Sequence, residues 1–264
     1  MLNFCSLYSS SSGNCLFVQS DNTNILIDCG VSTRKIETAL DKINISPESI
    51  SGILVTHEHS DHIQSIGNFS CKYNIPVYIN NETWDALPID QREKIADVNH
   101  KEIYIDEKFN LGDLEILPFS IPHDAINPCG FNIFHDGKKI SIATDLGHMT
   151  DNILKSLEKS SFILLESNYE PEVLKFSRYP YILKKRIDGP NGHLSNIIAG
   201  NTISKLIPTG LNSVMLGHLS KENNFPELAY KTVMEQIVEN NFSEDSIILN
   251  IADRNAPSKI IKIS

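Results

Sequence analysis

The chain of 264 residues has no long apolar run and no obvious targeting segment. No stretch of about eighteen consecutive apolar residues occurs, which excludes a typical membrane-spanning helix. Residues 1–5 lack the charged start and the apolar middle of a secretory signal. We therefore expect a protein that stays in the cytoplasm and does not associate with membranes.

Cysteine is scarce, and the five cysteines form an odd set without any Cys-x-x-Cys spacing. This pattern argues against a disulfide framework and against a zinc site held by thiolates. We expect reduced and mostly buried thiols instead. The residues concerned are Cys5, Cys15, Cys29, Cys71 and Cys129.

Basic residues are too few for a broadly basic surface, and the formal net charge is -10. Proteins that bind nucleic acid without sequence preference usually neutralise phosphates with clustered lysine and arginine. One local basic cluster is present, at Lys184, Lys185 and Arg186. The acidic average therefore weakens a nucleic-acid hypothesis without excluding it, because part of the acidity would serve as metal ligands.

No low-complexity linker, charge block or repeat divides the sequence, so a single domain over residues 1–264 is expected. Strands in hairpins mixed with helices predict an α+β fold, a four-layer αββα sandwich. Strands are predicted at residues 15–19, 24–28, 52–56, 76–79, 131–134, 139–143, 162–165, 214–216 and 246–251, and helices at 33–43, 63–73, 152–159, 195–206 and 226–238.

Three histidines and an aspartate lie close together in the segment Thr56-His57-Glu58-His59-Ser60-Asp61-His62, directly after an apolar run. Neutral imidazole and carboxylate are ligands that zinc, manganese and iron accept. Four ligands this close in sequence would strain a single site. The spacing therefore favours two metals, with His57 and His59 on one and Asp61 and His62 on the other. The alternative is a polar loop with a chance excess of histidine.

Further polar residues lie at or just beyond the ends of the predicted strands. Strand ends on one rim of a sandwich can converge on a common site, so this placement extends the histidine segment to a larger cluster. The residues at these positions are Asp28, His57, His123, Asp145, Glu166 and His218.

The sequence resembles the metallo-β-lactamase-fold hydrolases over nearly its whole length. The matching motifs run from Asp28 through residues 57–62, His123 and Asp145 to His218. The resemblance implies an αββα fold, a dinuclear metal centre, and phosphodiesterase or DNA exonuclease activity. Further motifs are similar to the YycJ (also called WalJ) group of this family: Ser9-Ser10-Ser11-Ser12-Gly13-Asn14, Pro122-His123-Asp124-Ala125, Thr144-Asp145-Leu146-Gly147, Glu166-Ser167-Asn168, Gly192-His193-Leu194-Ser195-Asn196 and Gly217-His218-Leu219-Ser220.

The resemblance also implies a ligand set for two divalent ions, Mn or Zn, with Fe as a further candidate. Two such ions can share a water, lower its pKa and so provide a bridging hydroxide as the nucleophile. By resemblance, His57, His59 and His123 would hold the first metal, Asp61, His62 and His218 the second, and Asp145 would bridge both.

Two residues near these ligands are expected to support the site indirectly. Asp28 would orient His57 or a metal-bound water, and the alternative is a turn carboxylate that caps the following helix. His148 stands where relatives often carry a tyrosine. A structural role for His148 is favoured over an approach to the metals.

Substrate contacts are predicted around His193. In similar phosphodiesterases a histidine at this place contacts the scissile phosphate or protonates the leaving group, although a role as a plain helix-cap residue is the alternative. Ser195 and Asn196 would add donors for phosphate at the start of a helix. Lys184, Lys185 and Arg186 would guide a polyanion, while a solvated surface is the usual fate of such a trio.

The leading hypothesis is therefore a dinuclear-metal phosphodiesterase that acts on nucleic acid, DNA rather than RNA, and by resemblance is a 5′ to 3′ DNA exonuclease. A thioesterase or lactonase would use the same hydroxide on a carbonyl carbon. A noncatalytic binding protein is disfavoured because the ligand set is complete, and a di-iron oxidoreductase because a glutamate would be expected at His59. The sequence by itself leaves open the metal, the choice between DNA, RNA and a small phosphodiester, the polarity of degradation and the oligomeric state.

Overall fold

The computed structural model describes residues 1–263, which divide into two compact units. The first unit comprises Met1–Ser120, Ala125–Lys138 and Asp253–Ser264, and the second comprises Ile121–Asp124 and Lys139–Ala252. The expectation of a single domain over residues 1–264 stays a prediction.

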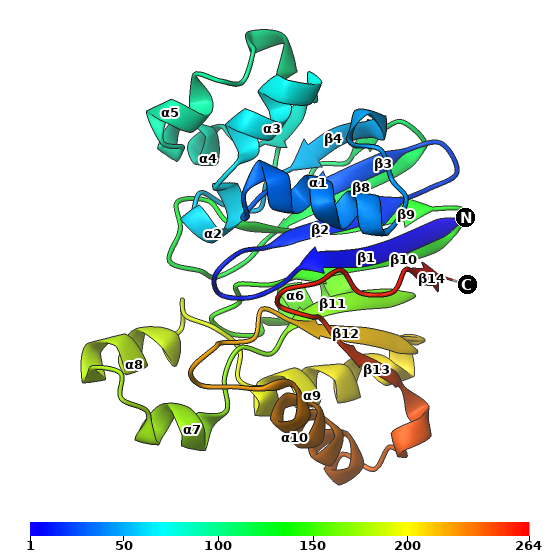
Figure 1. Cartoon of the computed structure of the whole chain (residues 1–264). Helices are drawn as coiled ribbons and strands as arrows, with labels where there is room; N and C mark the ends of the chain where they lie inside the picture. Colours follow the sequence, from blue (N-terminus) through cyan, green and yellow to red (C-terminus); the bar gives the residue numbers. More distant parts are fainter. Residues whose placement is uncertain (264) are drawn as a thin grey trace. The chain divides into compact units, whose positions relative to one another are not determined.

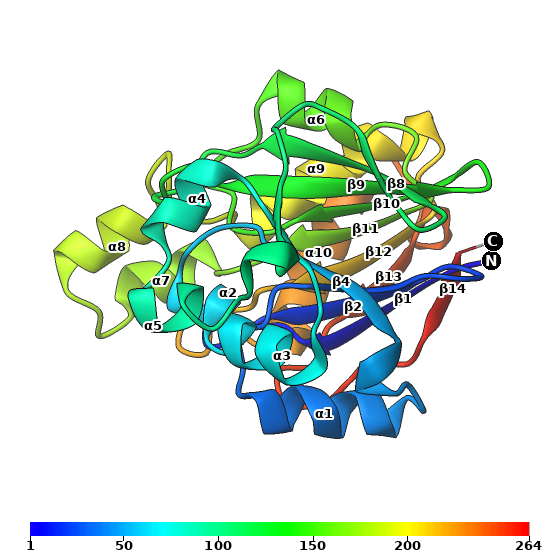
Figure 2. The same cartoon turned by 90° about the horizontal axis from the view of Figure 1, so that it is seen from above.

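The first unit contains a mixed sheet in which the described strands follow the order β14-β1-β2-β3-β4-β5-β6 (Figures 1 and 2). Pairing is antiparallel from β14 to β3 and parallel from β3 to β6. The strands are β1 (Leu2–Tyr8), β2 (Cys15–Gln19), β3 (Asn24–Ile27), β4 (Ile50–Leu54), β5 (Val77–Ile79), β6 (His100–Glu102) and β14 (Ile261–Ile263).

The first unit also holds three antiparallel strands, β7 (Phe109–Leu111), β8 (Leu114–Ser120) and β9 (Cys129–His135). In β8 the buried Leu114 and Ile116 alternate with less buried neighbours, as expected for a strand with one face on the core.

Helices of the first unit follow the strands of the parallel part. The predicted helix at 33–43 is confirmed as α1, which buries Ile36, Ala39 and Leu40 on one face. The bounds are α1 (Thr33–Lys42), α2 (Ser60–Ile63), α3 (Ile66–Tyr73), α4 (Asn81–Ala86) and α5 (Ile89–Arg92), with 3-10 turns η1 (Pro47–Ser49) and η2 (Asp97–Asn99).

The continuous helix predicted at 63–73 is wrong, because the chain breaks between α2 and α3 at Ser65. Ser65 has φ -127° and ψ 17°, outside the helical region. Its hydroxyl donates to the carbonyl of Val31 at 2.6 Å, and its backbone N–H donates to the carbonyl of Cys29 at 3.0 Å. A serine that bonds to a distant backbone in this way competes with the helical hydrogen-bond pattern.

The second unit is built on four parallel strands in the order β10-β11-β12-β13 within the described chain; β11 and most of β10 and β12 are buried, while β13 is half-buried to exposed. The apolar runs of β10, β11 and β12 lack alternation, as expected for parallel strands with both faces covered. Figure 1 shows α9 and α10 side by side on one side of these strands. The elements are β10 (Lys138–Ala143), α6 (Asp151–Leu157), β11 (Phe162–Glu166), α7 (Pro171–Phe176), α8 (Tyr181–Ile187), α9 (Asn196–Leu206), η3 (Ile207–Thr209), β12 (Ser213–Gly217), α10 (Pro226–Glu239), η4 (Glu244–Ser246) and β13 (Ile248–Ile251).

The carboxyl ends of β10, β11 and β12 place three predicted site residues at one edge of these strands. Asp145 follows β10, Glu166 ends β11, and His218 follows β12. Parallel strands end at a common edge, which is where ligands bind in open α/β sheets. In the described part of the chain, no helix has the length and apolar character needed to cross a membrane.

Candidate functional site

The histidine segment of the first unit lies in the loop after β4 and in the short helix α2. His57 and His62 are buried, and their ring centroids are 4.1 Å apart. The ring of His59 is 4.6 Å from that of His57. The three imidazoles predicted from the spacing are therefore gathered in one place within this unit.

Asp28 organises this cluster through Thr56. The buried Asp28 carboxylate accepts a hydrogen bond from the backbone N–H of Thr56 at 2.9 Å and from its hydroxyl at 2.8 Å. The same carboxylate contacts Nδ1 of His62 at 2.7 Å, and the Thr56 hydroxyl contacts Nδ1 of His57 at 3.0 Å. Asp28 thus orients His62 directly and reaches His57 through a hydroxyl, an arrangement that directs the Nε2 lone pair of each ring outward as a ligand.

Asp61 is held beside His62 by close backbone packing. Its Oδ2 lies 3.5 Å from Nε2 of His62, and its backbone carbonyl accepts from the N–H of Asn14 at 2.8 Å. A Cβ atom at Gly30 would lie 1.6 Å from the Asp61 carbonyl oxygen, so only glycine allows this approach. The position of Asp61 therefore depends on segments distant in the sequence.

The serine run before Asn14 is a tight turn with internal partners. The N–H of Ser10 donates to the side-chain oxygen of Asn14 at 3.0 Å, and the N–H of Gly13 donates to the Ser10 carbonyl at 3.1 Å. The N–H of Ser12 donates to the Ser10 hydroxyl at 3.2 Å. These bonds favour a structural turn over a cradle for phosphate.

In the second unit, Glu166 joins two histidines to two loops. The carboxylate is fully buried, and its Oε1 contacts Nδ1 of His193 at 2.8 Å and Nδ1 of His218 at 2.9 Å. Its Oε2 accepts from the backbone N–H of Leu146 at 2.8 Å and of Leu194 at 3.1 Å. One carboxylate therefore fixes the ring of a predicted ligand, the ring of the predicted acid and the loops that carry Asp145 and His193.

His123 and His218 both direct Nε2 toward Asp145. Nδ1 of His123 contacts the carbonyl of Gly192 at 3.1 Å, and its Nε2 is 3.6 Å from Oδ1 of Asp145. Nε2 of His218 is 3.5 Å from the same oxygen. Two ligands of a tetrahedral ion, each with a bond of about 2 Å, lie about 3.3 Å apart. Donor type and spacing in this unit therefore fit a divalent ion.

Three of the predicted site residues have a backbone conformation that non-glycine residues rarely adopt. The φ angles are 62° for Asp28, 61° for Asp145 and 55° for His218. Each such residue costs on the order of 1 kcal/mol, and such residues cluster at functional sites. These residues keep the unfavourable backbone conformation at the ends of strands. This indicates that the direction in which their side chains point is important for the site.

The loop that carries His193 is anchored to neighbouring loops of the second unit. A Cβ atom at Gly147 would lie 2.1 Å from the Pro190 carbonyl oxygen, so the two loops touch. His148 is exposed, and its Nδ1 contacts the same carbonyl at 2.8 Å. Arg186 forms an ion pair with Asp124, beside His123. The geometry agrees with a structural role for His148 and gives Arg186 an internal partner.

Ser195 and Asn196, expected to contact phosphate, are buried and have partners within the protein. The Ser195 hydroxyl accepts from the N–H of Ile198 at 3.3 Å and so caps α9. The Asn196 amide donates to Glu170 at 2.9 Å and to Asn224 at 3.1 Å, and Asn196 is fully buried. Direct phosphate contacts by these two residues stay a prediction that this geometry does not support.

The surroundings shift the pKa values of His193 and His123, the two histidines beside Asp145, in opposite directions. Burial lowers the pKa of His193, but the adjacent Glu166 outweighs this effect and raises it above its ordinary value. Burial lowers the pKa of His123, which favours the neutral imidazole that a metal requires. A proton is thus favoured on His193 and disfavoured on His123.

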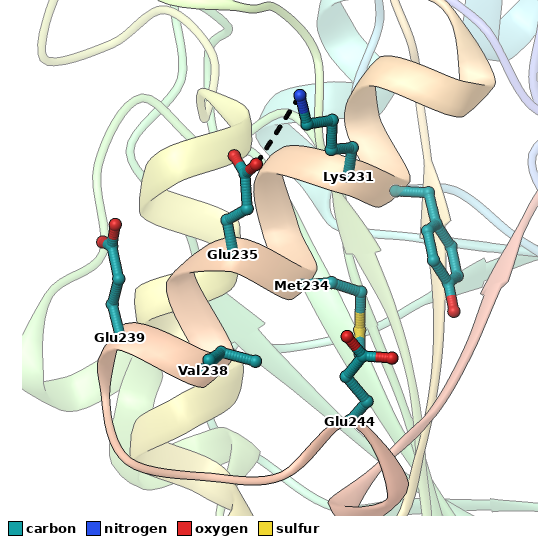
Figure 3. Close-up of a pocket in the computed structure, with 7 residues that line it drawn as sticks. Lys231, Met234, Glu235, Val238, Glu239 and Glu244 are labelled. Atoms are coloured by element: carbon teal, nitrogen blue, oxygen red, sulfur yellow. Dashed lines mark ion pairs between the residues drawn. The ribbon is translucent and has the colours of Figure 1, made fainter.

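A groove of about 540 Å³ on the second unit contains none of the predicted site residues. Figure 3 shows that α10 and the turn at Glu244 line it, with an ion pair between Lys231 and Glu235. Glu239 and Glu244 add further negative charge. Because acidic side chains repel phosphate, this groove does not suit a nucleic-acid backbone.

Comparison with known proteins identifies the family. The family model described as "Beta-lactamase superfamily domain" matches residues 23–208, which is more than half of the chain. The chain belongs to this family. An exodeoxyribonuclease WalJ from Streptococcus pneumoniae serotype 2 is 35% identical over 234 residues, covering 88% of this chain and 87% of the relative.

Two further comparisons concern a second sequence relative and a solved structure. An exodeoxyribonuclease YycJ from Bacillus anthracis is 33% identical over 269 residues, covering 98% of each chain. The crystal structure of the metallo-beta-lactamase fold protein YhfI from Bacillus subtilis aligns with a TM-score of 0.72 at 16% identity, over 97% of this chain and 98% of that chain. The second comparison concerns the fold alone.

These findings confirm the predicted family and the α+β, four-layer αββα class. They also confirm the prediction of a metal-dependent hydrolase with divalent ions as cofactors. The predicted ligands are divided along the chain, with His57, His59, Asp61 and His62 in the first unit, and His123, Asp145 and His218 in the second. Their joint ligation of metal stays a prediction.

Sequence reasoning underestimated two residues. Thr56 received no role, although its hydroxyl links Asp28 to His57. For Glu166 the sequence left two roles open, ordering the ligand shell through hydrogen bonds or merely ending its strand; the contact with His193 as well as His218 goes beyond both. The position of Glu166 in the sequence could have indicated this role, because Glu166 ends a parallel strand that lies between the strands leading to Asp145 and His218.

Proposed function

We propose that this member of the beta-lactamase superfamily is a metal-dependent phosphodiesterase that degrades DNA from the 5′ end. The observation that carries the proposal is the contact of the fully buried Glu166 with His193, beside Asp145 and His218. Phosphodiester hydrolysis needs a proton for the leaving oxygen, and this contact keeps a proton available. The relatives named exodeoxyribonuclease support DNA as the substrate.

We propose two divalent ions, Mn or Zn, with Fe as a further candidate. The proposed ligands are those expected from the sequence: His57, His59, Asp61, His62, His123, Asp145 and His218. When bound, such ions supply Lewis acidity and a hydroxide at neutral pH. Support within each unit comes from imidazole rings whose Nδ1 atoms are fixed by carboxylate, hydroxyl or carbonyl oxygens, which makes Nε2 the ligand atom. In His62 the side-chain amide of Asn14 contacts Nε2 at 3.0 Å and would have to move for His62 to bind metal.

The side chains of the second unit would divide the remaining work. Asp145 would align the nucleophile, since its carboxylate lies between the Nε2 atoms of His123 and His218. His193 would donate its proton to the leaving 3′ oxygen of the nucleotide, and its side chain keeps 19% of its surface exposed for this contact. Glu166 would hold His193 in the protonated form and in the required orientation. These roles follow the usual division between an acid and the carboxylate that orients it.

A comparison of small substrates tests the reaction class. The purified protein with Mn²⁺ should hydrolyse bis-p-nitrophenyl phosphate, and should leave an acyl thioester and a lactone intact. Turnover of the thioester or the lactone without phosphodiester hydrolysis would replace this proposal by the alternative class. A cytoplasmic location and a preference for DNA over RNA also remain predictions.

A further inference from the structure

Helices α7 and α8 carry large apolar side chains that are mostly exposed. The exposed fractions are 77% for Phe176, 69% for Tyr181 and 82% for Ile182. In both views the two helices project to the left of the strands and of α9 and α10 in the same unit (Figures 1 and 2). Exposed aromatic residues this close together mark an interaction surface rather than a core.

Lysine side chains lie over the two exposed aromatic rings. The ammonium of Lys175 is 5.2 Å from the centroid of the Phe176 ring, and that of Lys185 is 5.0 Å from the centroid of the Tyr181 ring. The ammonium of Lys184 donates to the carbonyl of Lys175 at 2.7 Å and so ties α8 to α7. Each aromatic ring therefore has a positive charge beside it.

The charge of this segment is opposite to that of the whole chain. Residues 171–188 contain five basic and two acidic side chains, which gives a formal charge of five minus two, or +3, in a chain with a net charge of -10. The basic residues are Lys175, Arg178, Lys184, Lys185 and Arg186. Exposed aromatic rings combined with positive charge are the surface that proteins use to bind single-stranded nucleic acid.

The segment leads directly to the proposed acid. The backbone N–H of His193 donates to the carbonyl of Ile187, the last residue of α8, at 2.9 Å. Arg186 pairs with Asp124 next to His123, and Tyr169 bonds to Asp188. A strand bound on α7 and α8 would therefore be anchored to the same loop that carries His193.

We propose that α7 and α8 form a platform, defined as Lys175, Phe176, Tyr181, Lys184 and Lys185, that holds the uncleaved part of a single DNA strand. Phe176 and Tyr181 stack on unpaired bases, and the three lysines neutralise phosphates. This inference rests on the proposed function, because it assigns the strand to a nuclease. It adds a binding surface separate from the metal ligands and predicts that affinity rises with strand length.

Binding of a fluorescent oligothymidylate of about 12 nucleotides, measured by anisotropy in EDTA, tests the platform. The double variant F176A/Y181A should bind at least about tenfold more weakly, because base stacking on each ring is lost. The double variant K184Q/K185Q should lower the slope of log Kd against log salt by about 1.4, which corresponds to two phosphate contacts on a single strand.

Tyr230 and Lys231 on α10 supply matched controls, since Tyr230 is 45% exposed and Lys231 is a surface lysine of the same unit. Y230A and K231Q should leave both the affinity and the salt slope unchanged. Wild-type protein that degrades DNA while the platform variants bind it normally would overturn the platform alone. Wild-type protein that neither binds nor degrades DNA would overturn the proposed function as well. If the platform variants bound DNA normally but, unlike wild type, failed to bind phosphatidylglycerol vesicles, the surface would serve a membrane instead and the platform would be overturned.

Discussion

Replacing Glu166 by glutamine should damage both the stability and the activity of the protein, although the side chain keeps its size. The carboxylate accepts hydrogen bonds from the rings of His193 and His218 and from the backbone N–H groups of Leu146 and Leu194. An amide replaces one of the two acceptor oxygens by an NH₂ group, which is a donor. Whichever way the glutamine turns, donors will face donors in a fully buried site.

The magnitude follows from the number of groups that lose their acceptor. Two buried donors are left unsatisfied, at about 1–3 kcal/mol each, so the free energy of unfolding should fall by about 2–6 kcal/mol. His193 also loses the charge that holds its proton and orientation. Loss of such an orienting partner typically costs about 10–100-fold in activity.

Urea unfolding followed by far-ultraviolet circular dichroism measures the first effect, and turnover of DNA with Mn²⁺ measures the second. Circular dichroism is preferable to fluorescence because the single tryptophan, Trp84, lies in the first unit. Glu166→Asp is the matched control, since it keeps the charge and shortens the reach. A glutamine variant with wild-type stability and wild-type turnover would refute the role assigned to Glu166.

Three further changes probe separate parts of the molecule. Asp61→Ala should abolish turnover and leave a folded protein with less bound metal, because Asp61 is a proposed ligand and its side chain, in the short helix α2, is partly exposed; elemental analysis with an unchanged metal content would contradict this ligation. His193→Ala should lower kcat on DNA by about 10²–10⁴-fold, and bis-p-nitrophenyl phosphate by far less, since nitrophenolate leaves without a proton; a full rate on DNA would rule out the acid role. Burial raises the pKa of Asp113, but hydrogen bonds from Ser20 and other donors outweigh it and lower the pKa to about 2. The resulting stability is present above the ordinary pKa and is lost as pH falls toward 2, so Asp113→Asn should cost about 1 kcal/mol near neutral pH. The gap in urea midpoint between this variant and wild type should narrow as pH falls below about 4 and close only near pH 2; a gap independent of pH would contradict the shift.

The sequence predicted the parts of the site that depend on local order. The spacing of His57, His59 and His62 gathers their rings because all three lie in the short stretch formed by the loop after β4 and the helix α2. Asp145 and His218 could be predicted because a buried parallel strand ends just before each of them. In these cases the strand pattern alone predicts that the residue lies at the edge of the sheet.

Contacts that depend on pairing between distant segments could not be predicted. The link from Asp28 to Thr56 requires β3 beside β4, where the N–H of Asp28 donates to the Leu54 carbonyl at 2.9 Å. Asn196 looked like a donor for phosphate at a helix start, yet Asn224 and Glu170 bury it. Such partners are set by tertiary packing, which local patterns do not record.

Strand β1 was missed for a different reason. Residues Leu2–Tyr8 are buried throughout, so the run lacks the alternation that identifies a half-buried strand. The break in the helix predicted at 63–73 was missed because Ser65 bonds to the carbonyl of Val31, more than thirty residues away.

The most direct test of the central claim is the degradation of DNA labelled at one end or the other by protein first stripped of metal. Addition of Mn²⁺ should restore activity, which should saturate at about two ions per chain. A label at the 5′ end should be released as a short product from the start of the reaction, while a label at the 3′ end stays on shortening strands. DNA that stays intact with Mn²⁺, or that is degraded equally in EDTA, would contradict a metal-dependent exodeoxyribonuclease.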